Sequence, residues 1–266
     1  MITHQSKEKD FICNLLRSTK PIFESFNKYD RKRISIGHAP AETKSDGIIA
    51  KFLVDNIHAK FPNDSIIAED FDPLVQLNSK ATWIIDPIDG TIPFMSHIPT
   101  FMVSIYRQVN GILVSAYAYD PTQDLLYASV SDNLTCNSKI VKVSDQQILS
   151  EARILISGHA LDTMPNLYAD LRKAGAFVIV QEGLIFRSLL VASGHADATI
   201  QTTLKTFEAG TIIKSITAAG GIVLDVPDKQ IPDWKKTTNN VIISNNHLFN
   251  PLHRIVTNNI NNGSIK

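Results

Sequence analysis

Two carboxylates and a hydroxyl follow one apolar stretch of this sequence, and their spacing could bring a metal ion and a phosphate to one point. The stretch covers residues 83–91 and reads WIIDPIDGT. Its apolar part is typical of a buried strand, which Pro87 should end because proline fixes φ and lacks an N–H. Gly90 permits positive φ or the close approach of a ligand. Oxygen ligands this dense suit Mg²⁺, and the N–H groups of the Gly-Thr turn suit phosphate.

An ordinary surface turn is the alternative, because Asp-Pro and Asp-Gly are common turn formers. Two features favour a metal and phosphate site over a surface turn. The apolar residues 83–85 should put Asp86 at the mouth of a core rather than on a distant loop. A second acidic pair, Glu69-Asp70, also follows a short apolar strand. The sequence therefore predicts two sets of acids, each directly after a strand.

These motifs resemble the metal-binding signature of the inositol monophosphatase superfamily, which contains Mg²⁺-dependent phosphatases of the lithium-sensitive type. Thr43-x-x-Asp46 is similar to the motif at the start of the family's second helix, and residues 61–70 are similar to its segment with an acidic pair. Phe207-Glu208, followed by Ala-Ala-Gly-Gly at 218–221, is similar to a helix late in the family's sequences. The resemblance implies a layered α/β fold, an α-β-α-β-α sandwich of the inositol monophosphatase and fructose bisphosphatase type.

The resemblance also implies a role for each matched residue. The implied metal ligands are Glu69, Asp86, the carbonyl of Ile88, Asp89 and Glu208. The implied catalytic residues are Thr91 and Asp46, which would orient the attacking water, together with Glu69. The implied substrate-binding residues are Gly90 and Thr91, whose N–H groups would hold the phosphate, with Gln201 and Glu208.

Several positions depart from the family pattern. Glu208 replaces the usual Asp, and Phe207 replaces the Trp before it. Gln201 occupies the position where inositol phosphatases carry a sugar-binding Glu. Arg187 could face a second anionic group of a substrate, but a surface ion pair is the expectation for it. Metal-site residues are thus mostly kept, while substrate-pocket residues are mostly changed.

The expected function is Mg²⁺-dependent hydrolysis of a small, inositol monophosphate-like phosphate monoester. A metal-activated water would attack directly, with no covalent enzyme intermediate. A 3′(2′),5′-bisphosphate nucleotidase or a histidinol-phosphatase on the same site is one alternative. Another alternative is a degenerate family member that acts through protein contacts. The resemblance further implies a homodimer.

The amino-acid composition argues against several other classes of protein. The 266 residues are 44% hydrophobic and 20% charged, which is enough for a packed core. Twenty-six basic residues balance 26 acidic ones, so neither nucleic acid nor an acidic membrane surface is the expected partner. We find no run of ~18 apolar residues that could span a membrane, no signal-peptide core and no CxxC motif, so a cytoplasmic location is expected.

Apolar periodicity predicts the order of the elements. Helices are expected at 5–29, with a disturbed turn at Pro21, and at 44–60, and an antiparallel meander should surround the Asn110-Gly111 hairpin signal. After a polar join, strands and helices should alternate. The predicted domains are 1–140, which carries the metal motif, and 141–266. The predicted strands are 65–68, 82–86, 101–109, 111–119, 124–130, 152–157, 176–180, 197–201, 221–225 and 240–244, and the later helices are 163–174, 184–194, 207–219 and 246–259.

Overall fold

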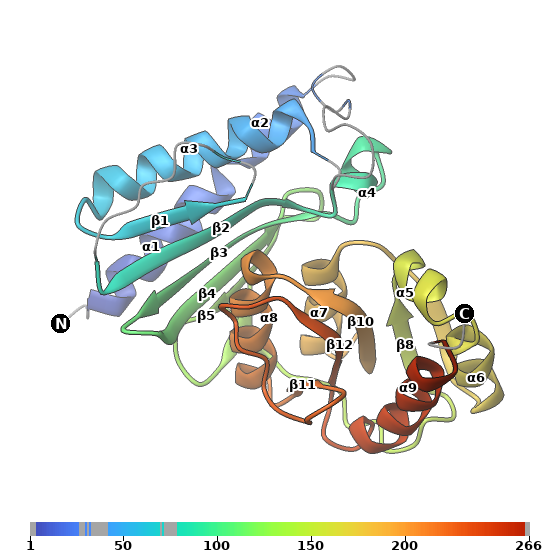
Figure 1. Ribbon diagram of the computed structural model, residues 1–266. Coiled ribbons are helices and arrows are strands. Elements are labelled where there is room, and N and C mark those ends of the chain that lie inside the picture. The colour runs from blue at the N-terminus through green and yellow to red at the C-terminus, as the bar shows by residue number, and fades with distance from the viewer. Residues whose placement is uncertain are drawn as a thin grey trace. The chain divides into compact units, whose positions relative to one another are not determined.

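The computed structural model describes residues 4–26, 30, 32, 42–69, 71 and 79–263 (Figure 1). The chain divides into two compact units, one of Met1–Ser131 with Thr135–Lys139 and one of Asp132–Leu134 with Ile140–Lys266. Among the described helices, none is long and apolar enough to cross a membrane. The domains predicted at 1–140 and 141–266 stay predictions.

The first unit is built on a seven-stranded sheet with the order β1-β2-β3-β4-β5-β6-β7. β1 runs parallel to β2, and β2 to β5 form the predicted antiparallel meander. The predicted hairpin is confirmed, because Asn110 and Gly111 both have positive φ, as a two-residue turn of this kind requires. The strands are β1 (Ser65–Ala68), β2 (Ala81–Asp89), β3 (Met102–Val109), β4 (Ile112–Asp120), β5 (Leu125–Ser129), β6 (Leu134–Cys136) and β7 (Lys139–Val141).

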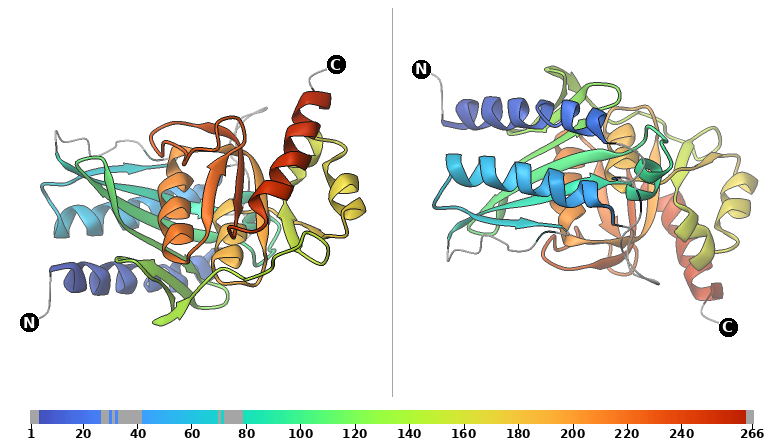
Figure 2. Two further views of the ribbon diagram at one scale, coloured as in Figure 1. Left: turned by 90° about the horizontal axis from the view of Figure 1, so that it is seen from below. Right: turned by 90° about the horizontal axis from the view of Figure 1, so that it is seen from above.

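Two long helices, α1 (His4–Arg17) and α3 (Lys44–Lys60), cover one face of this sheet (Figure 2). Their apolar side chains form one core with Trp83, Ile85 and the inward residues of β3 and β4. The predicted first helix is interrupted before Pro21, and α2 (Lys20–Ser25) begins there with the proline in its first turn.

A buried ionic network fixes α1 to the sheet. The Glu8 carboxylate accepts hydrogen bonds from Arg107 Nη1 at 2.9 Å and Ser115 Oγ at 2.8 Å. Arg107 Nη2 also donates to Asp64 Oδ2 at 2.7 Å, and Trp83 Nε1 donates to the same oxygen at 2.9 Å. The network therefore joins α1, the segment before β1, and the strands β2, β3 and β4 at the base of the WIIDPIDGT motif.

The second unit contains a five-stranded mixed sheet with the order β11-β12-β10-β8-β9. α5, α6 and α9 pack on one face, and α7 and α8 pack on the other (Figure 1). The predicted alternation and the mixed α/β class are confirmed. In place of the single helix predicted at 163–174, the structure has two short helices, α5 and α6, which are separated near Pro165 because proline cannot donate a helical hydrogen bond. The elements are β8 (Arg153–Ile156), α5 (Gly158–Thr163), α6 (Leu167–Lys173), β9 (Phe177–Val180), α7 (Leu184–Ala192), β10 (Ala198–Leu204), α8 (Thr206–Ala218), β11 (Ile222–Asp225), β12 (Thr238–Ser244) and α9 (Phe249–Gly263).

Asp197 precedes β10 and ties it to β8. Its Oδ2 accepts from the Arg153 N–H at 2.6 Å and from Arg153 Nε at 3.0 Å. Burial raises the pKa of Asp197, but the hydrogen bonds from Arg153 and Ser144 and the charge of Arg153 outweigh burial and hold that pKa below its ordinary value. The ionised carboxylate therefore stabilises the fold at neutral pH, and this stabilisation is lost as the pH falls through the lowered pKa.

Replacing Asp197 should consequently weaken the second unit. We expect Asp197→Asn to lower the free energy of unfolding by about 1–3 kcal/mol at pH 7, because it leaves Arg153 donors unsatisfied. The difference from the parent protein should be smaller at ~pH 2, because the parent carboxylate becomes protonated only as the pH falls below the ordinary Asp value of ~3.9 and through its lowered pKa. Urea titrations at both pH values measure this, with the exposed Asp162→Asn as control. Equal stability of the variant and the parent at pH 7 would contradict the role assigned to Asp197.

Candidate metal and phosphate site

The end of β2 carries a β-bulge. Asp86 pairs with Ser104 and Asp89 pairs with Met102, so three steps along β2 match two steps along β3. The prediction that Pro87 ends the strand is wrong, because β2 continues to Asp89. The bulge explains the difference: the ladder is already interrupted there, and the missing N–H of proline costs no hydrogen bond.

The bulge brings both carboxylates of the motif together. In a regular strand, residues three apart point to opposite faces of the sheet. Here an oxygen of Asp86 and one of Asp89 lie within 4.8 Å of each other. Both side chains are buried, with 1% and 4% of their surface exposed. Two buried carboxylates at this separation repel each other when both are ionised, and a bound cation relieves that repulsion.

A tight turn follows the two acids. Asp86 Oδ1 accepts a hydrogen bond from the Ile88 N–H at 3.1 Å. Gly90 has φ 88° and ψ 46°, a left-handed conformation that glycine adopts without strain, and it caps the short helix α4 (Thr91–Met95). Thr91 Oγ1 donates to the Ile88 carbonyl oxygen at 3.2 Å. The turn therefore places a carbonyl oxygen, a hydroxyl and the first N–H groups of a helix directly after the carboxylates.

Glu69 lies on the neighbouring strand end. β1 and β2 pair in parallel with Ala68 opposite Ile85, and the Glu69 N–H donates to the Ile85 carbonyl at 3.0 Å. The next step in this register puts Glu69 beside Asp86. The Glu69 carboxylate is half-buried and is not among the acids that the described residues gather within 4.8 Å of one another. The second acid of that pair, Asp70, lies outside the described residues.

Asp46 is part of a helix cap. Its Oδ2 accepts from the Thr43 N–H at 2.7 Å and from Thr43 Oγ1 at 2.6 Å, while Thr43 Oγ1 accepts from the Ser45 N–H at 3.2 Å. This reciprocal arrangement is a capping box at the start of α3. Asp46 is therefore a helix-capping residue in the structure, and its role toward a water stays a prediction.

Glu208 occupies the same position at the start of α8 as Asp46 does at the start of α3. It is the third residue of the helix, it is half-buried, and its Oε2 accepts from the Lys205 N–H at 3.1 Å. Glu208 therefore caps the start of its helix, and its role as a metal ligand stays a prediction. A cap does not exclude metal binding, because an ionised carboxylate has two oxygens and about four lone-pair sites.

Gln201 is held inside the second unit by both ends of its amide. Its Oε1 accepts from Arg187 Nη2 at 2.5 Å, and its Nε2 donates to the Thr203 carbonyl at 2.7 Å. Arg187 is 1% exposed and also donates to the Gln181 carbonyl at 2.7 Å. The expectation of a surface ion pair for Arg187 is therefore wrong. The signal missed in the sequence is a single arginine within the apolar helix LIFRSLLVA.

Comparison with known proteins identifies relatives over almost the whole chain. Residues 21–260 match the inositol monophosphatase family. Inositol monophosphatase 2 of Homo sapiens is 31% identical over 211 residues, which are 74% of this chain and 73% of that protein. Histidinol-phosphatase of Chlorobaculum parvum is 28% identical over 191 residues, with 71% and 73% covered. The fold resembles that of an IMPase/NADP phosphatase solved with Mg²⁺ and phosphate, with TM-score 0.82, 20% identity and 95% and 96% covered.

The contacts of Gln201 generate a prediction about stability. Gln201→Ala removes the acceptor of Arg187 Nη2 in a buried place, so we expect the free energy of unfolding to fall by about 1–3 kcal/mol. Gln201→Glu restores an acceptor and should be milder than the alanine variant. Chemical denaturation measures both, with the exposed Gln147→Ala as control. An alanine variant as stable as the parent would show that this amide does not support Arg187.

Proposed function

Because the chain belongs to the inositol monophosphatase family, we propose that it is a Mg²⁺-dependent hydrolase of a small phosphate monoester. The observation that carries the proposal is the pair of buried carboxylates, Asp86 and Asp89, held within 4.8 Å at the bulge. A left-handed glycine and a threonine follow them directly. A protein of similar fold was solved in complex with Mg²⁺ and phosphate, which supports the proposal of a metal ion and a phosphate group at this site.

The donors at this turn fit Mg²⁺. Carboxylate and carbonyl oxygens are the hard ligands that this ion prefers. In our proposal Asp86, Asp89 and the carbonyl of Ile88 hold the metal, Glu69 contributes from the end of β1, and Glu208 is a further ligand. When bound, Mg²⁺ neutralises phosphoryl oxygens, lowers the pKa of a bound water and stabilises the leaving alkoxide.

The remaining residues of the motif act on the substrate and the water. The N–H groups of Gly90 and Thr91 stand at the beginning of α4, where helical N–H groups lack intrahelical acceptors, and they bind phosphate oxygens. The Thr91 hydroxyl already donates to Ile88, so it accepts from the attacking water and fixes its position. Asp46 orients the same water. Each of these residues is held by backbone or capping hydrogen bonds, so little ordering is needed during the reaction.

We propose an inositol monophosphate-like ester as the substrate class. Gln201 would contact the alcohol part as a neutral amide, with Arg187 holding its orientation. The similarity to a histidinol-phosphatase favours histidinol phosphate as a second candidate. Phosphate release from inositol 1-phosphate, histidinol phosphate and an adenosine 3′,5′-bisphosphate, each with Mg²⁺, decides among these substrates. Hydrolysis of none of them would support the degenerate, protein-binding alternative.

The homodimer and the cytoplasmic location stay predictions. β9 is the edge strand of the second sheet, and Phe177, Ile179 and Val180 on it are 54%, 50% and 47% exposed. Exposed apolar edge strands pair readily with another chain, which supports a second copy of this chain as the partner.

The central role of Asp89 gives a first kinetic prediction. Asp89→Asn keeps the shape of the side chain but removes a charged ligand, so turnover should fall at least ~10²-fold, the effect of losing one strong electrostatic contact in a transition state. Mg²⁺-dependent phosphate release measures it, and the exposed Asp228→Asn serves as the matched control. Normal turnover by the Asp89 variant, or full activity of the parent in EDTA, would refute the metal proposal.

Substitutions of Glu208 can separate its proposed role as a metal ligand from its role as a helix cap. Glu208→Gln keeps an oxygen for the Lys205 N–H but removes the charge, so we expect near-parent stability with a raised Mg²⁺ requirement and sharply lower turnover. Glu208→Asp should retain more activity because the carboxylate remains. Mg²⁺ titrations of turnover, alongside thermal unfolding of each variant, test both statements. Unchanged Mg²⁺ dependence and turnover in Glu208→Gln would mean that Glu208 is not a metal ligand.

A further inference from the structure

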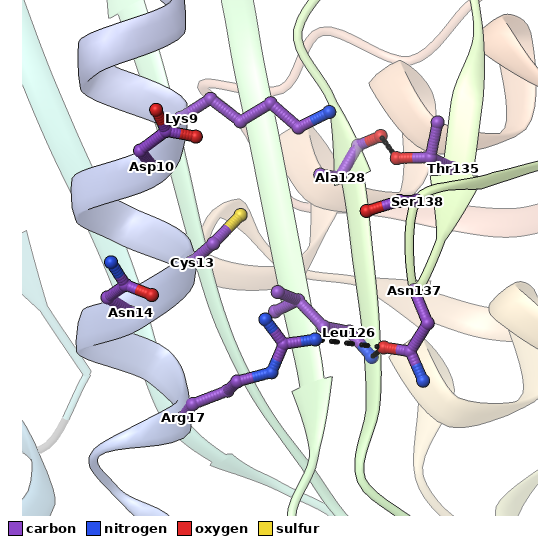
Figure 3. A pocket seen from close by; sticks show the side chains of 10 residues that line it. All are labelled: Lys9, Asp10, Cys13, Asn14, Arg17, Leu126, Ala128, Thr135, Asn137 and Ser138. Carbon is purple, nitrogen blue, oxygen red and sulfur yellow. Dashed lines mark hydrogen bonds between the residues drawn. The ribbon is translucent and has the colours of Figure 1, made fainter.

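A pocket of about 180 Å³ lies in the first unit between α1 and the β5–β6 hairpin (Figure 3). It shares no residue with the acidic site at the end of β2. Its volume is below the ~300–1,000 Å³ of pockets that take drug-sized ligands. Any ligand that fits this pocket must therefore be a small molecule.

Three residues of α1 form one wall. Lys9, Cys13 and Arg17 are spaced by four residues, so they share one face of the helix. Eight residues of helix span about 12 Å, and Lys9 and Arg17 accordingly lie at the two ends of the pocket with the thiol between them (Figure 3). Leu126 and Ala128 face this helix from β5. The pocket is therefore cationic at both ends and more apolar in the middle.

The charges of Lys9 and Arg17 influence the Cys13 thiol at the centre of the pocket. Burial raises the pKa of the Cys13 thiol, while the charges of Lys9 and Arg17 oppose that rise and the charge of Asp10 adds to it. The thiol therefore stays neutral at physiological pH and supplies no competing anion. The positive charges nevertheless reach it, so an anionic group placed beside Lys9 or Arg17 is attracted by that side chain.

The Arg17 end is preorganised. Arg17 Nη2 donates to Asn137 Oδ1 at 3.2 Å, and the same oxygen accepts from the Leu126 N–H at 3.0 Å. Asn137 Nδ2 donates to the Asp124 carbonyl at 2.8 Å, so the amide is fixed from both sides. Arg17 Nε lies 3.8 Å from Asp124 Oδ1, but about half of each side chain is exposed, and such a pair is weak. The guanidinium keeps further N–H donors for a ligand.

The Lys9 end has a simpler arrangement. Among the residues that the structure describes, Lys9 has neither an ion pair nor a hydrogen bond through its side chain. Its side chain extends across the pocket toward β5 at Ala128 (Figure 3). The Thr135 hydroxyl, which donates to the Ala128 carbonyl at 3.1 Å, and the Ser138 hydroxyl add neutral polar groups to the opposite wall. Asp10, on the rim, is exposed to solvent.

We propose that this pocket binds a small organic molecule with an anionic group at each end and an apolar middle, the chemistry of a short-chain dicarboxylate. One anionic group contacts Lys9 and the other contacts Arg17, while the methylene chain lies along Cys13, Leu126 and Ala128. A molecule with a single anionic group uses only one of the two cations and binds less well.

The test compares diacids with monoacids of equal length. Succinate, glutarate and adipate, and the monoacids butyrate, pentanoate and hexanoate, are titrated into the full chain labelled with ¹⁵N, without added metal so that the acidic site does not contribute. We expect the amide signals of Cys13, Asn137 and Ser138 to shift, and the best diacid to bind about fivefold more tightly than its monoacid. Equal affinities, or no shift at these amides, would overturn the proposal.

Charge-removing variants locate the binding. Lys9→Gln and Arg17→Gln should each lower the affinity for the diacid to that of the matched monoacid, while Lys80→Gln, which removes an exposed lysine elsewhere in the first unit, should leave it unchanged. Among the described residues Lys9 has no hydrogen-bond or ion-pair partner to lose, so Lys9→Gln tests binding with little effect on folding, which unchanged signals outside the pocket would verify. Diacid binding that survives in both pocket variants would place the ligand elsewhere.

Discussion

The site depends on a strand that continues past a proline. Pro87 has no N–H to give to the ladder, and one extra residue between Asp86 and Asp89 absorbs the defect as a bulge. Without the bulge, the two carboxylates would lie on opposite faces of the sheet. With it, both are buried and close together, and the turn at Gly90 begins immediately. A backbone defect of the sheet is thus what brings the acids into one place.

Such a defect is tolerable because the rest of the strand is held firmly. Trp83 is fully buried in the first core, and its indole donates to Asp64, which also pairs with Arg107. Arg107 in turn pairs with the buried Glu8 of α1. A satisfied side-chain network of this kind adds to the rigidity that the ladder gives the strand. The acids therefore lie at the end of a strand that is anchored in the core through several elements.

Much of this could be predicted from sequence because it depends on local pattern. The helix at 44–60, the meander and the Asn110-Gly111 hairpin follow from apolar periodicity and turn chemistry, and the structure has them nearly residue for residue. The continuation of β2 past Pro87 could not be predicted, because it depends on how β3 pairs with it. The burial of Arg187 likewise depends on Gln201, which lies on a different element. Long-range pairing decided both outcomes.

Asp46 and Glu208 show why a cap and a functional role are hard to separate by pattern. Each is the third residue of its helix and accepts a hydrogen bond from the backbone N–H of the N-cap residue, Thr43 or Lys205. The helix dipole and the cap both favour the ionised form of such an acid, which is also the form that a metal or an oriented water requires. The cap uses one oxygen, fixes the side-chain rotamer and leaves the charge in place. Capping therefore prepares an acid for chemistry rather than competing with it, and only a substitution that keeps the cap and removes the charge tells the two roles apart.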